Sequence, residues 1–302
     1  MAVVKCAIEL RIADVVIDNH GSPMTLSELT TTLGCEPSRL HRIMRFLVHY
    51  RIFKEEPVTV DSIGFALTSL SRRLIRHGER SMAALILLES SPVMLAPWHS
   101  LSAHVNSWNS PFEAANGKDV WSYAAVNPGH SKLINDAMAC DAKVVVSAVI
   151  EGCPQVFDGI KSLVDVGGGN GTALSMLVKV FPWIHGINFD LPHVVAVAPK
   201  VDSTDTSEVT CSSVSQMQTL FPYEAIPHDE GKVIIVQSVI EDNKDDKLEF
   251  VRLMLDMVMM THTGKGKERT LKQWEYVVSE AGFTRFNIKR INAIQSVIEA
   301  YV

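Results

Sequence analysis

The chain has 302 residues, enough for one large domain or two modest ones that each bury a core. Hydrophobic residues make up 47% and charged residues 21%, which excludes a disordered or low-complexity chain, and the net charge of −6 argues against a nucleic-acid partner. No apolar run approaches the roughly 20 residues of a membrane span, and the five cysteines form no CxxC pair. We therefore expect a cytoplasmic protein with reduced thiols, no membrane contact and no metal site.

The N-terminal segment has the element order of a winged helix. Apolar residues at helical spacing predict helices over Val3–Val16, Thr25–Leu33 and Pro37–Tyr50. Phe53–Glu56 and Gly64–Thr68 have the pattern of two short strands around a turn. Three helices followed by a hairpin are typical of this fold.

The third of these helices carries a row of basic residues. Arg39, Arg42, Arg45 and His49 lie together on its polar side, where a DNA-binding winged helix places its contacts. The chain is acidic overall and has no basic arm beside this helix, so a solvated surface is the preferred interpretation. DNA binding is kept as a remote alternative.

Helical periodicity dominates residues 78–160, and the pattern changes at Ser162. Ser162–Val166 is a short apolar strand that runs into a glycine loop, Thr172–Phe181 is a helix, and Ile184–Asp190 is a second strand. A strand, a loop, a helix and a strand in this order predict a parallel βαβ unit. The remaining elements, which we expect to finish the sheet, are a strand at Val233–Val239, helices at Lys247–His262 and Thr270–Ala281, and strands near Phe283–Ile291 and Ser296–Val302.

The glycine loop favours one class of nucleotide-like cofactor. Counted from Gly167 and Gly169, the last position of a dinucleotide-binding G-x-G-x-x-G/A fingerprint is Thr172, so a pyrophosphate site is not indicated. Asp190 ends the second strand 25 residues after Asp165, where a carboxylate can accept hydrogen bonds from a ribose diol. S-adenosylmethionine has this ribose and no phosphate, so the pattern favours it over a purely structural glycine turn.

These motifs resemble the plant S-adenosylmethionine-dependent O-methyltransferases that act on small molecules. The similarity covers nearly the whole chain and is carried by Val164–Gly171, Gly186–Val194, Asp256–Met260, Gly266–Thr270, Lys5–Leu10, Arg42–Arg45 and Pro111–Glu113. It implies an α/β fold in which residues 161–302 form a Rossmann-like methyltransferase domain with an incomplete sheet. Residues 1–77 would form a winged-helix dimerisation domain, and residues 78–160 a helical bridge that contributes to the acceptor pocket.

The resemblance also implies the residues of the site. Gly167, Gly168, Gly169, Asp190 and Leu191 would bind the cofactor, and no metal ion is needed. Trp98, Met138 and Met259 would line a pocket for a small hydroxylated aromatic acceptor, because thioethers adapt to flat rings. The family likeness further implies a homodimer, or a heterodimer with a paralogue.

The chain departs from the family pattern at the catalytic base. The family uses a His in a His-Asp-Trp motif, and this sequence has none; the stretch between Lys200 and Glu224 is about twenty residues short, enough for a strand and its helix. Gln237 stands where the family has an acidic residue, so only Glu268 remains of the catalytic set. His228–Asp229 is better explained as a surface turn, and the family counterpart of His262 is not the base.

Three hypotheses follow from these observations. The first is an O-methyltransferase of plant phenolics, with a flavonoid, phenylpropanoid or alkaloid hydroxyl as acceptor, weakened cofactor binding and impaired transfer because the base is missing. The second is a non-catalytic partner that pairs with an intact paralogue through its N-terminal domain. The third is the winged-helix DNA binder.

Overall fold

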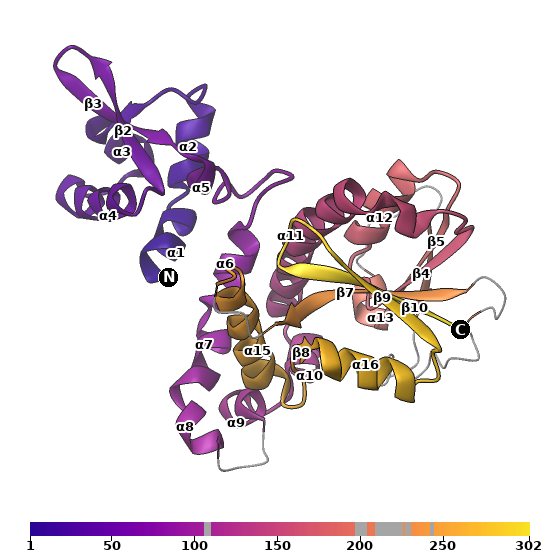
Figure 1. The fold of residues 1–302 in the computed structure, drawn as a ribbon. Coiled ribbons are helices and arrows are strands. Elements are labelled where there is room, and N and C mark those ends of the chain that lie inside the picture. The colour runs from indigo at the N-terminus through magenta and orange to yellow at the C-terminus, as the bar shows by residue number, and fades with distance from the viewer. Residues whose placement is uncertain (106–109, 197–203, 209–225, 227–230, 242–244) are drawn as a thin grey trace. The chain divides into compact units, whose positions relative to one another are not determined.

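The computed structural model describes residues 1–105, 110–196, 204–208, 226, 231–241 and 245–302 (Figure 1). The chain forms two compact units, one of residues 1–92 with 132–141 and the other of residues 93–131 with 142–302. The long helix α11 (Pro128–Gly152) contributes residues to both units.

The first unit is a winged helix around a single core. Its helices are α1 (Ala2–Glu9), α2 (Ile12–Asp18), α3 (Leu26–Leu33), α4 (Pro37–His49), α5 (Ser69–Arg72) and α6 (Ala83–Glu89). Its antiparallel sheet has the order β1 (Met24–Thr25), β3 (Ser62–Leu67) and β2 (Phe53–Thr59). Ile8, Leu40, Met44 and Phe53 are almost fully buried in the core, so the predicted apolar stripe of α4 faces inward as expected.

The helix predicted over Val3–Val16 is wrong as a single element. Arg11 has a left-handed backbone, with φ 61° and ψ 32°, and this residue separates α1 from α2. The side chain of Arg76 binds the end of α1, donating from Nε to the carbonyl oxygen of Ile8 at 3.2 Å and from a terminal nitrogen to that of Glu9 at 3.1 Å. The carbonyl oxygen of Ile8 also accepts from the backbone N–H of Arg11 at 3.0 Å, so Arg76 reinforces the end of α1 at the point where the helix is interrupted.

Helix α4 begins with a side-chain cap that the sequence did not single out. The carboxylate of Glu36 accepts hydrogen bonds from the backbone N–H groups of Ser38 and Arg39 at 2.9 and 2.8 Å. These bonds favour the charged form and lower the pKa of Glu36. Pro37, the first residue of the helix, has no N–H group to satisfy.

The second unit contains a helical part and an α/β part. The helical part consists of α7 (Pro92–His99), α8 (Leu101–His104), α9 (Pro111–Asn116), α10 (Val120–Val126) and the C-terminal part of α11. The helices of the α/β part are η1 (Pro154–Phe157), α12 (Thr172–Val180), α13 (Pro192–Val195), α15 (Glu249–Thr263) and α16 (Leu271–Glu280).

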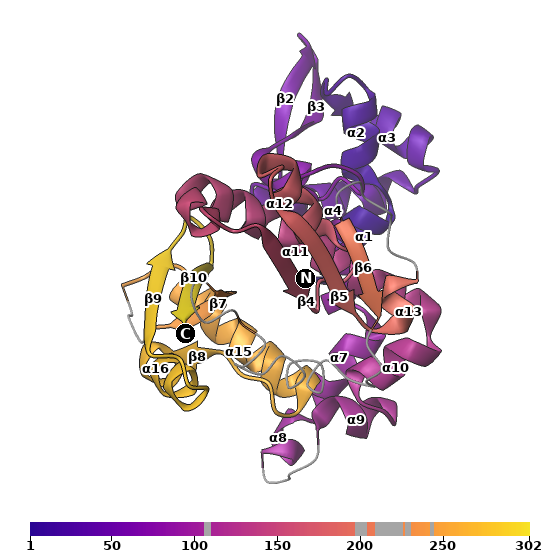
Figure 2. The same cartoon turned by 90° about the vertical axis from the view of Figure 1, so that its right-hand side faces the viewer.

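The described strands of this unit form two sheets, not the single sheet that the last strands were expected to finish (Figure 2). One sheet is parallel, with β4 (Ser162–Val166) beside β5 (His185–Asp190) and β5 beside β6 (Thr204–Glu208). The other has the order β8 (Arg269–Thr270), β7 (Lys232–Ile240), β10 (Gln295–Tyr301), β9 (Arg285–Arg290). Among the described residues, β4 has a strand neighbour on one edge only.

A shared core holds the α/β part together. Leu174 and Val178 of α12 pack with Val149 of α11 and with Val297 of β10 in one buried cluster. Gly186 of β5 permits this packing, because a Cβ atom there would lie 3.0 Å from the side chains of both α12 residues. The predicted βαβ unit is thereby confirmed.

Candidate cofactor and acceptor site

The glycine loop leaves β4 and enters α12 through three left-handed glycines. Gly167, Gly169 and Gly171 have φ values of 76°, 59° and 77°, a region that other residues rarely adopt. The side-chain oxygen of Asn170 accepts hydrogen bonds from the N–H and the hydroxyl of Thr172 at 3.2 and 2.7 Å. The backbone of the loop is therefore held in one shape at the start of α12.

Asp190 braces this loop from the end of β5. Its two carboxylate oxygens accept hydrogen bonds from the N–H of Gly169 at 2.7 Å and from that of Leu191 at 2.6 Å, and the side chain is buried. The structure thus brings together Asp190, Leu191 and the glycines, as the sequence predicted. It also assigns Asp190 a structural role that sequence reasoning missed, because the strand-end position alone does not reveal the bond to the loop.

Gly168 lies where no side chain fits. A Cβ atom there would lie 2.1 Å from Asn188 Oδ1 and 2.7 Å from Asp165 Oδ2. Burial, followed by the nearby Asp190 carboxylate, raises the pKa of Asp165 to about 6. Asn188 donates from Nδ2 to the carbonyl oxygen of Gly169 at 3.1 Å, while its buried Oδ1 has no hydrogen-bond partner among the described residues.

This arrangement fits the methionine end of S-adenosylmethionine. A free amide oxygen and a carboxylate beside a glycine cradle are suited to a positively charged donor such as an amino group. An acidic residue in this position would repel a pyrophosphate, in agreement with the failed dinucleotide fingerprint. The Gly-Asp-Met-Phe segment with which the family holds adenine is expected to be missing between Lys200 and Glu224, a stretch that lies mostly outside the described residues.

Glu268 and Gln237 are brought together from distant parts of the chain. Gln237 on β7 donates from Nε2 to Glu268 Oε2 at 3.2 Å, and the backbone N–H of Glu268 donates to Asp256 Oδ1 at 2.9 Å. Burial raises the pKa of Glu268, and the neighbouring Asp256 adds to the rise. The amide of Gln237 therefore satisfies Glu268 directly.

An aromatic cluster surrounds His262 near the end of α15. The ring of His262 makes edge-to-face contacts with Trp98 and Phe112, with centroid distances of 5.9 and 6.3 Å. Nε2 lies 3.0 Å from the carbonyl oxygen of Met94, and burial lowers the pKa of this histidine, so the ring is neutral and Nε2 is the donor. The buried, neutral imidazole ring of His262 is therefore a packing element of this aromatic cluster.

Met259 lies one turn before His262 on α15. Its Cε atom is 2.7 Å from the position that a Cβ atom would take at Gly266, so that glycine makes room for the thioether. In the sequence, the spacing of three residues between Met259 and His262 indicates that the two side chains lie on the same face of this helix.

Two features singled out in the sequence, Met138 and His228–Asp229, are not part of the site as the described residues of this unit define it. Met138 belongs to the other compact unit and is 47% exposed, so its role in the pocket stays a prediction. His228–Asp229 lies outside the described residues. Within the described ranges, no group of three or more His, Cys, Asp or Glu residues is arranged to hold a metal ion, and no helix is long and apolar enough to cross a membrane.

Comparison with known families explains this combination of domains. The model of the O-methyltransferase dimerisation domain matches residues 1–77, and the model of the O-methyltransferase domain matches residues 98–222 and 205–284. The chain belongs to the plant-type family of S-adenosylmethionine-dependent O-methyltransferases, with a Rossmann-like α/β domain and an N-terminal dimerisation domain.

Individual relatives match over almost the entire chain. An acetylserotonin O-methyltransferase of Arabidopsis thaliana is 48% identical over 340 aligned residues, covering 100% of this chain and 88% of the relative. Flavonoid 4'-O-methyltransferase 4 of Mentha piperita is 38% identical, covering 99% of this chain and 92% of the relative. The crystal structure of human N-acetylserotonin methyltransferase in complex with S-adenosylmethionine has a TM-score of 0.82 at 18% identity, with 99% and 93% of the two chains covered, and shows the same fold.

Proposed function

We propose that this O-methyltransferase acts on the phenolic hydroxyl of a small plant aromatic, and that its transfer step is impaired because the segment with the base is missing. The relatives named above act on acetylserotonin and on flavonoids, and a further relative, from Thalictrum flavum subsp. glaucum, is a (RS)-norcoclaurine 6-O-methyltransferase. Acceptors of this class carry a hydroxyl on a flat ring, which suits the indole of Trp98 and the thioether of Met259, while the same role for Met138 rests on the family resemblance alone.

The observation that carries the proposed impairment is the environment of Glu268. When the cofactor is bound, it supplies the methyl group, and the protein must remove the hydroxyl proton as the oxygen attacks. Glu268 accepts a hydrogen bond from the Gln237 amide, and an amide cannot take up a proton near neutral pH. His262 donates from Nε2 to the carbonyl oxygen of Met94, and its Nδ1 has no hydrogen-bond partner among the described residues but is buried in the aromatic cluster. The Gln237–Glu268 pair therefore offers no free base, and we propose that the buried His262 does not take that role.

The alignment lengths support a missing segment. The alignment with the Arabidopsis relative spans 340 positions, whereas this chain has 302 residues, so at least 38 of those positions have no counterpart here. This number exceeds the stretch of about twenty residues expected from the motifs, which corresponds to a strand and its helix. A lost strand beside β4 is consistent with the division of the sheet.

We also propose the organisation expected from the sequence. Residues 1–77 form the dimerisation domain of a homodimer or of a heterodimer with a paralogue, residues 78–160 contribute to the acceptor pocket, and residues 161–302 bind the cofactor through Gly167–Gly169, Asp190 and Leu191. The protein acts in the cytoplasm.

The decisive experiment combines cofactor binding with methyl transfer. Calorimetry should detect weakened binding of S-adenosylmethionine to the chain and none to Asp190→Ala, which loses the brace of the loop. Incubation with labelled cofactor and a panel of N-acetylserotonin, flavonoids and alkaloid phenols should give little or no labelled product. Transfer at the rate of an intact relative would refute the impairment, and unchanged binding to Asp190→Ala would refute the assignment of the cofactor site.

A second candidate function is a non-catalytic partner of an intact paralogue. The observation that favours it is a complete winged-helix unit beside the altered catalytic centre. Light scattering of a mixture with an intact relative tests this function, and failure to form a mixed dimer would exclude it.

A further inference from the structure

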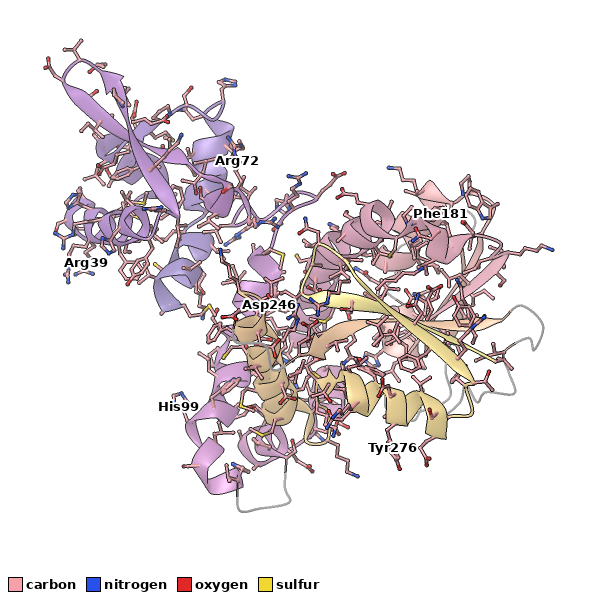
Figure 3. The ribbon with its side chains drawn as sticks, in the orientation of Figure 1. Arg39, Arg72, His99, Phe181, Asp246 and Tyr276 are labelled. Carbon is pink, nitrogen blue, oxygen red and sulfur yellow. The ribbon has the colours of Figure 1, made fainter. Side chains whose placement is uncertain are left out.

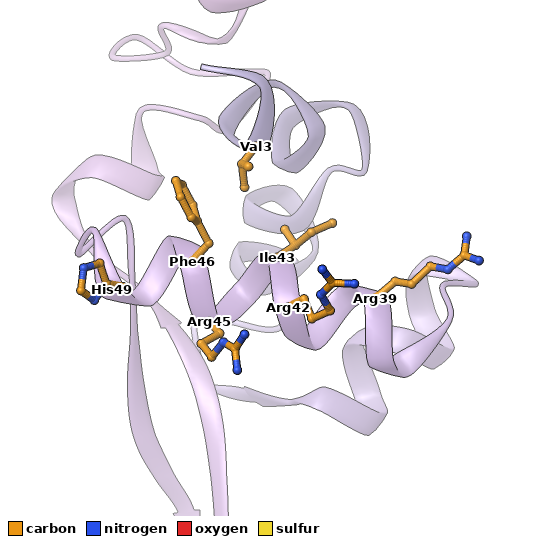
Figure 4. A pocket seen from close by; sticks show the side chains of 7 residues that line it. All are labelled: Val3, Arg39, Arg42, Ile43, Arg45, Phe46 and His49. Carbon is orange, nitrogen blue, oxygen red and sulfur yellow. The ribbon is translucent and has the colours of Figure 1, made fainter.

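The basic row on α4 borders a hollow with an apolar floor (Figure 4). The hollow has a volume of about 620 Å³, and Val3 of α1 points toward Phe46 and Ile43 of α4 across its floor. Arg39, Arg42 and Arg45 supply its positive rim. Phe46 is 42% exposed, although a large apolar side chain is usually buried. We call this surface the basic groove.

The arginines of the basic groove have little internal compensation. Within the described part of the chain, Arg39 has one loose contact, 4.0 Å from Glu36, and no ion pair is found for Arg42 or Arg45. Residues 1–77 contain ten Lys and Arg against eight Asp and Glu, a net charge of +2, in a chain whose total is −6. Unpaired guanidinium groups around apolar side chains suit an acidic segment that also carries exposed apolar residues.

The β2–β3 hairpin of the same unit has this composition. Its exposed apolar residues are Val58, Val60 and Ile63, of which Val60 is fully exposed and Ile63 is 63% exposed. Glu55 and Asp61 are also exposed, and no ion pair is found for either within the described ranges. These valine and isoleucine side chains give the hairpin an exposed apolar surface that is suited to burial against another chain.

From this complementarity we propose that the β2–β3 hairpin of a second copy of this chain docks into the basic groove. The proposal rests on the dimer assigned above to residues 1–77 and identifies the contact. A twofold dimer makes the contact twice, with each groove receiving the partner's hairpin. A direct meeting of the two grooves is disfavoured, because six arginines would then face one another.

The test is the oligomeric state of the full chain, measured by sedimentation without cofactor or acceptor. The wild type should form dimers that weaken as salt is raised. Arg42→Glu/Arg45→Glu and, separately, Glu55→Arg/Asp61→Arg should each raise the dimer dissociation constant at least about tenfold, because each variant places like charges on both sides of the contact.

A mixture of the two charge-reversed variants is the most discriminating test of the contact. Each groove with glutamates would then face a hairpin with arginines, and the other contact of the mixed dimer would be wild type. We expect the mixed dimer to regain the wild-type dissociation constant within about threefold, because both contacts then pair opposite charges.

The matched control is Arg72→Glu/Arg73→Glu, which changes the charge equally at exposed positions on and just after α5, away from the groove (Figure 3). It should leave the dimer unchanged. Circular dichroism checks that all variants fold, and Arg42→Gln/Arg45→Gln replaces the reversed pair if that pair does not fold.

Several results would overturn the proposal: a monomeric wild type, an unchanged dimer after reversal of the groove, or no recovery in the mixture. Binding of duplex DNA that the groove reversal abolishes without affecting the dimer would also overturn it and would assign the arginines to nucleic acid. None of these measurements involves methyl transfer, so failure of this contact and failure of the proposed enzymatic function are separate outcomes.

Discussion

Two aspartates at the glycine loop should respond in opposite directions when their charge is removed. The rise in the pKa of Asp165 from 3.8 to about 6 means that its ionised form is disfavoured in the folded state. At about 1.36 kcal/mol per pKa unit, the full penalty is about 3 kcal/mol. Asp165 is only partly buried, so solvent screening reduces the expected penalty to about 1–2 kcal/mol. We predict that Asp165→Asn raises the free energy of unfolding by this amount at pH 7.

The pH dependence of this gain follows from proton linkage. Because the folded state holds the Asp165 proton more tightly than the unfolded state does, the wild type loses stability through this group as the pH rises from about 4 to about 6. The advantage of Asp165→Asn should therefore be small near pH 4 and complete near pH 7. The new amide can also donate toward the free Oδ1 of Asn188.

Asp190→Asn is the matched comparison. Both oxygens of Asp190 accept backbone hydrogen bonds, and an amide would direct an NH2 group at one of these N–H donors. Loss of charge-assisted hydrogen bonds costs about 1.5–3 kcal/mol, so this variant should be destabilised.

Urea denaturation followed by tryptophan fluorescence measures both effects in the relevant unit. All five tryptophans lie in residues 93–131 and 142–302, so the signal reports the second unit. The reasoning would be refuted if Asp165→Asn were less stable than the wild type at pH 7, or if its advantage were equally large at pH 4.

Three further predictions use the same principles. Gly168→Ala should abolish the binding of S-adenosylmethionine in calorimetry, because its Cβ atom would displace Asn188. Gly129→Ala, whose Cβ atom would meet nothing within 4 Å, should bind the cofactor normally. Equal binding by the two variants would contradict the assignment of the glycine loop as the cofactor site. Gln237→Glu should place a second carboxylate against Glu268, raise the pKa of Glu268 further and lower the melting temperature at pH 8 relative to that at pH 5. A difference between these two melting temperatures equal to that of the wild type would contradict this. Arg76→Ala should destabilise the first unit by about 1–3 kcal/mol in circular dichroism melts, because it removes the two side-chain hydrogen bonds to the end of α1. An equal loss of stability in Arg73→Ala would contradict this specific role of Arg76.

The local elements of this protein could be read from the sequence because their signals are local. The spacing of apolar residues predicted α4, and the turn from strand to glycines predicted β4 with the bounds observed, Ser162–Val166. The break at Arg11 could not be read in the same way. The apolar stripe continues across it, and part of what supports the break is Arg76, which lies 65 residues further along the chain.

The sequence by itself determined the family, the glycine loop and the residue types of the site, because motifs and periodicity reside in neighbouring residues. Only the tertiary structure decided that the described strands divide into two sheets, that Asp190 braces Gly169, and that Gln237 binds Glu268. Each of these features depends on which distant segments pack side by side, and that choice follows from the burial and hydrogen bonding of the whole chain, which no short window of sequence contains.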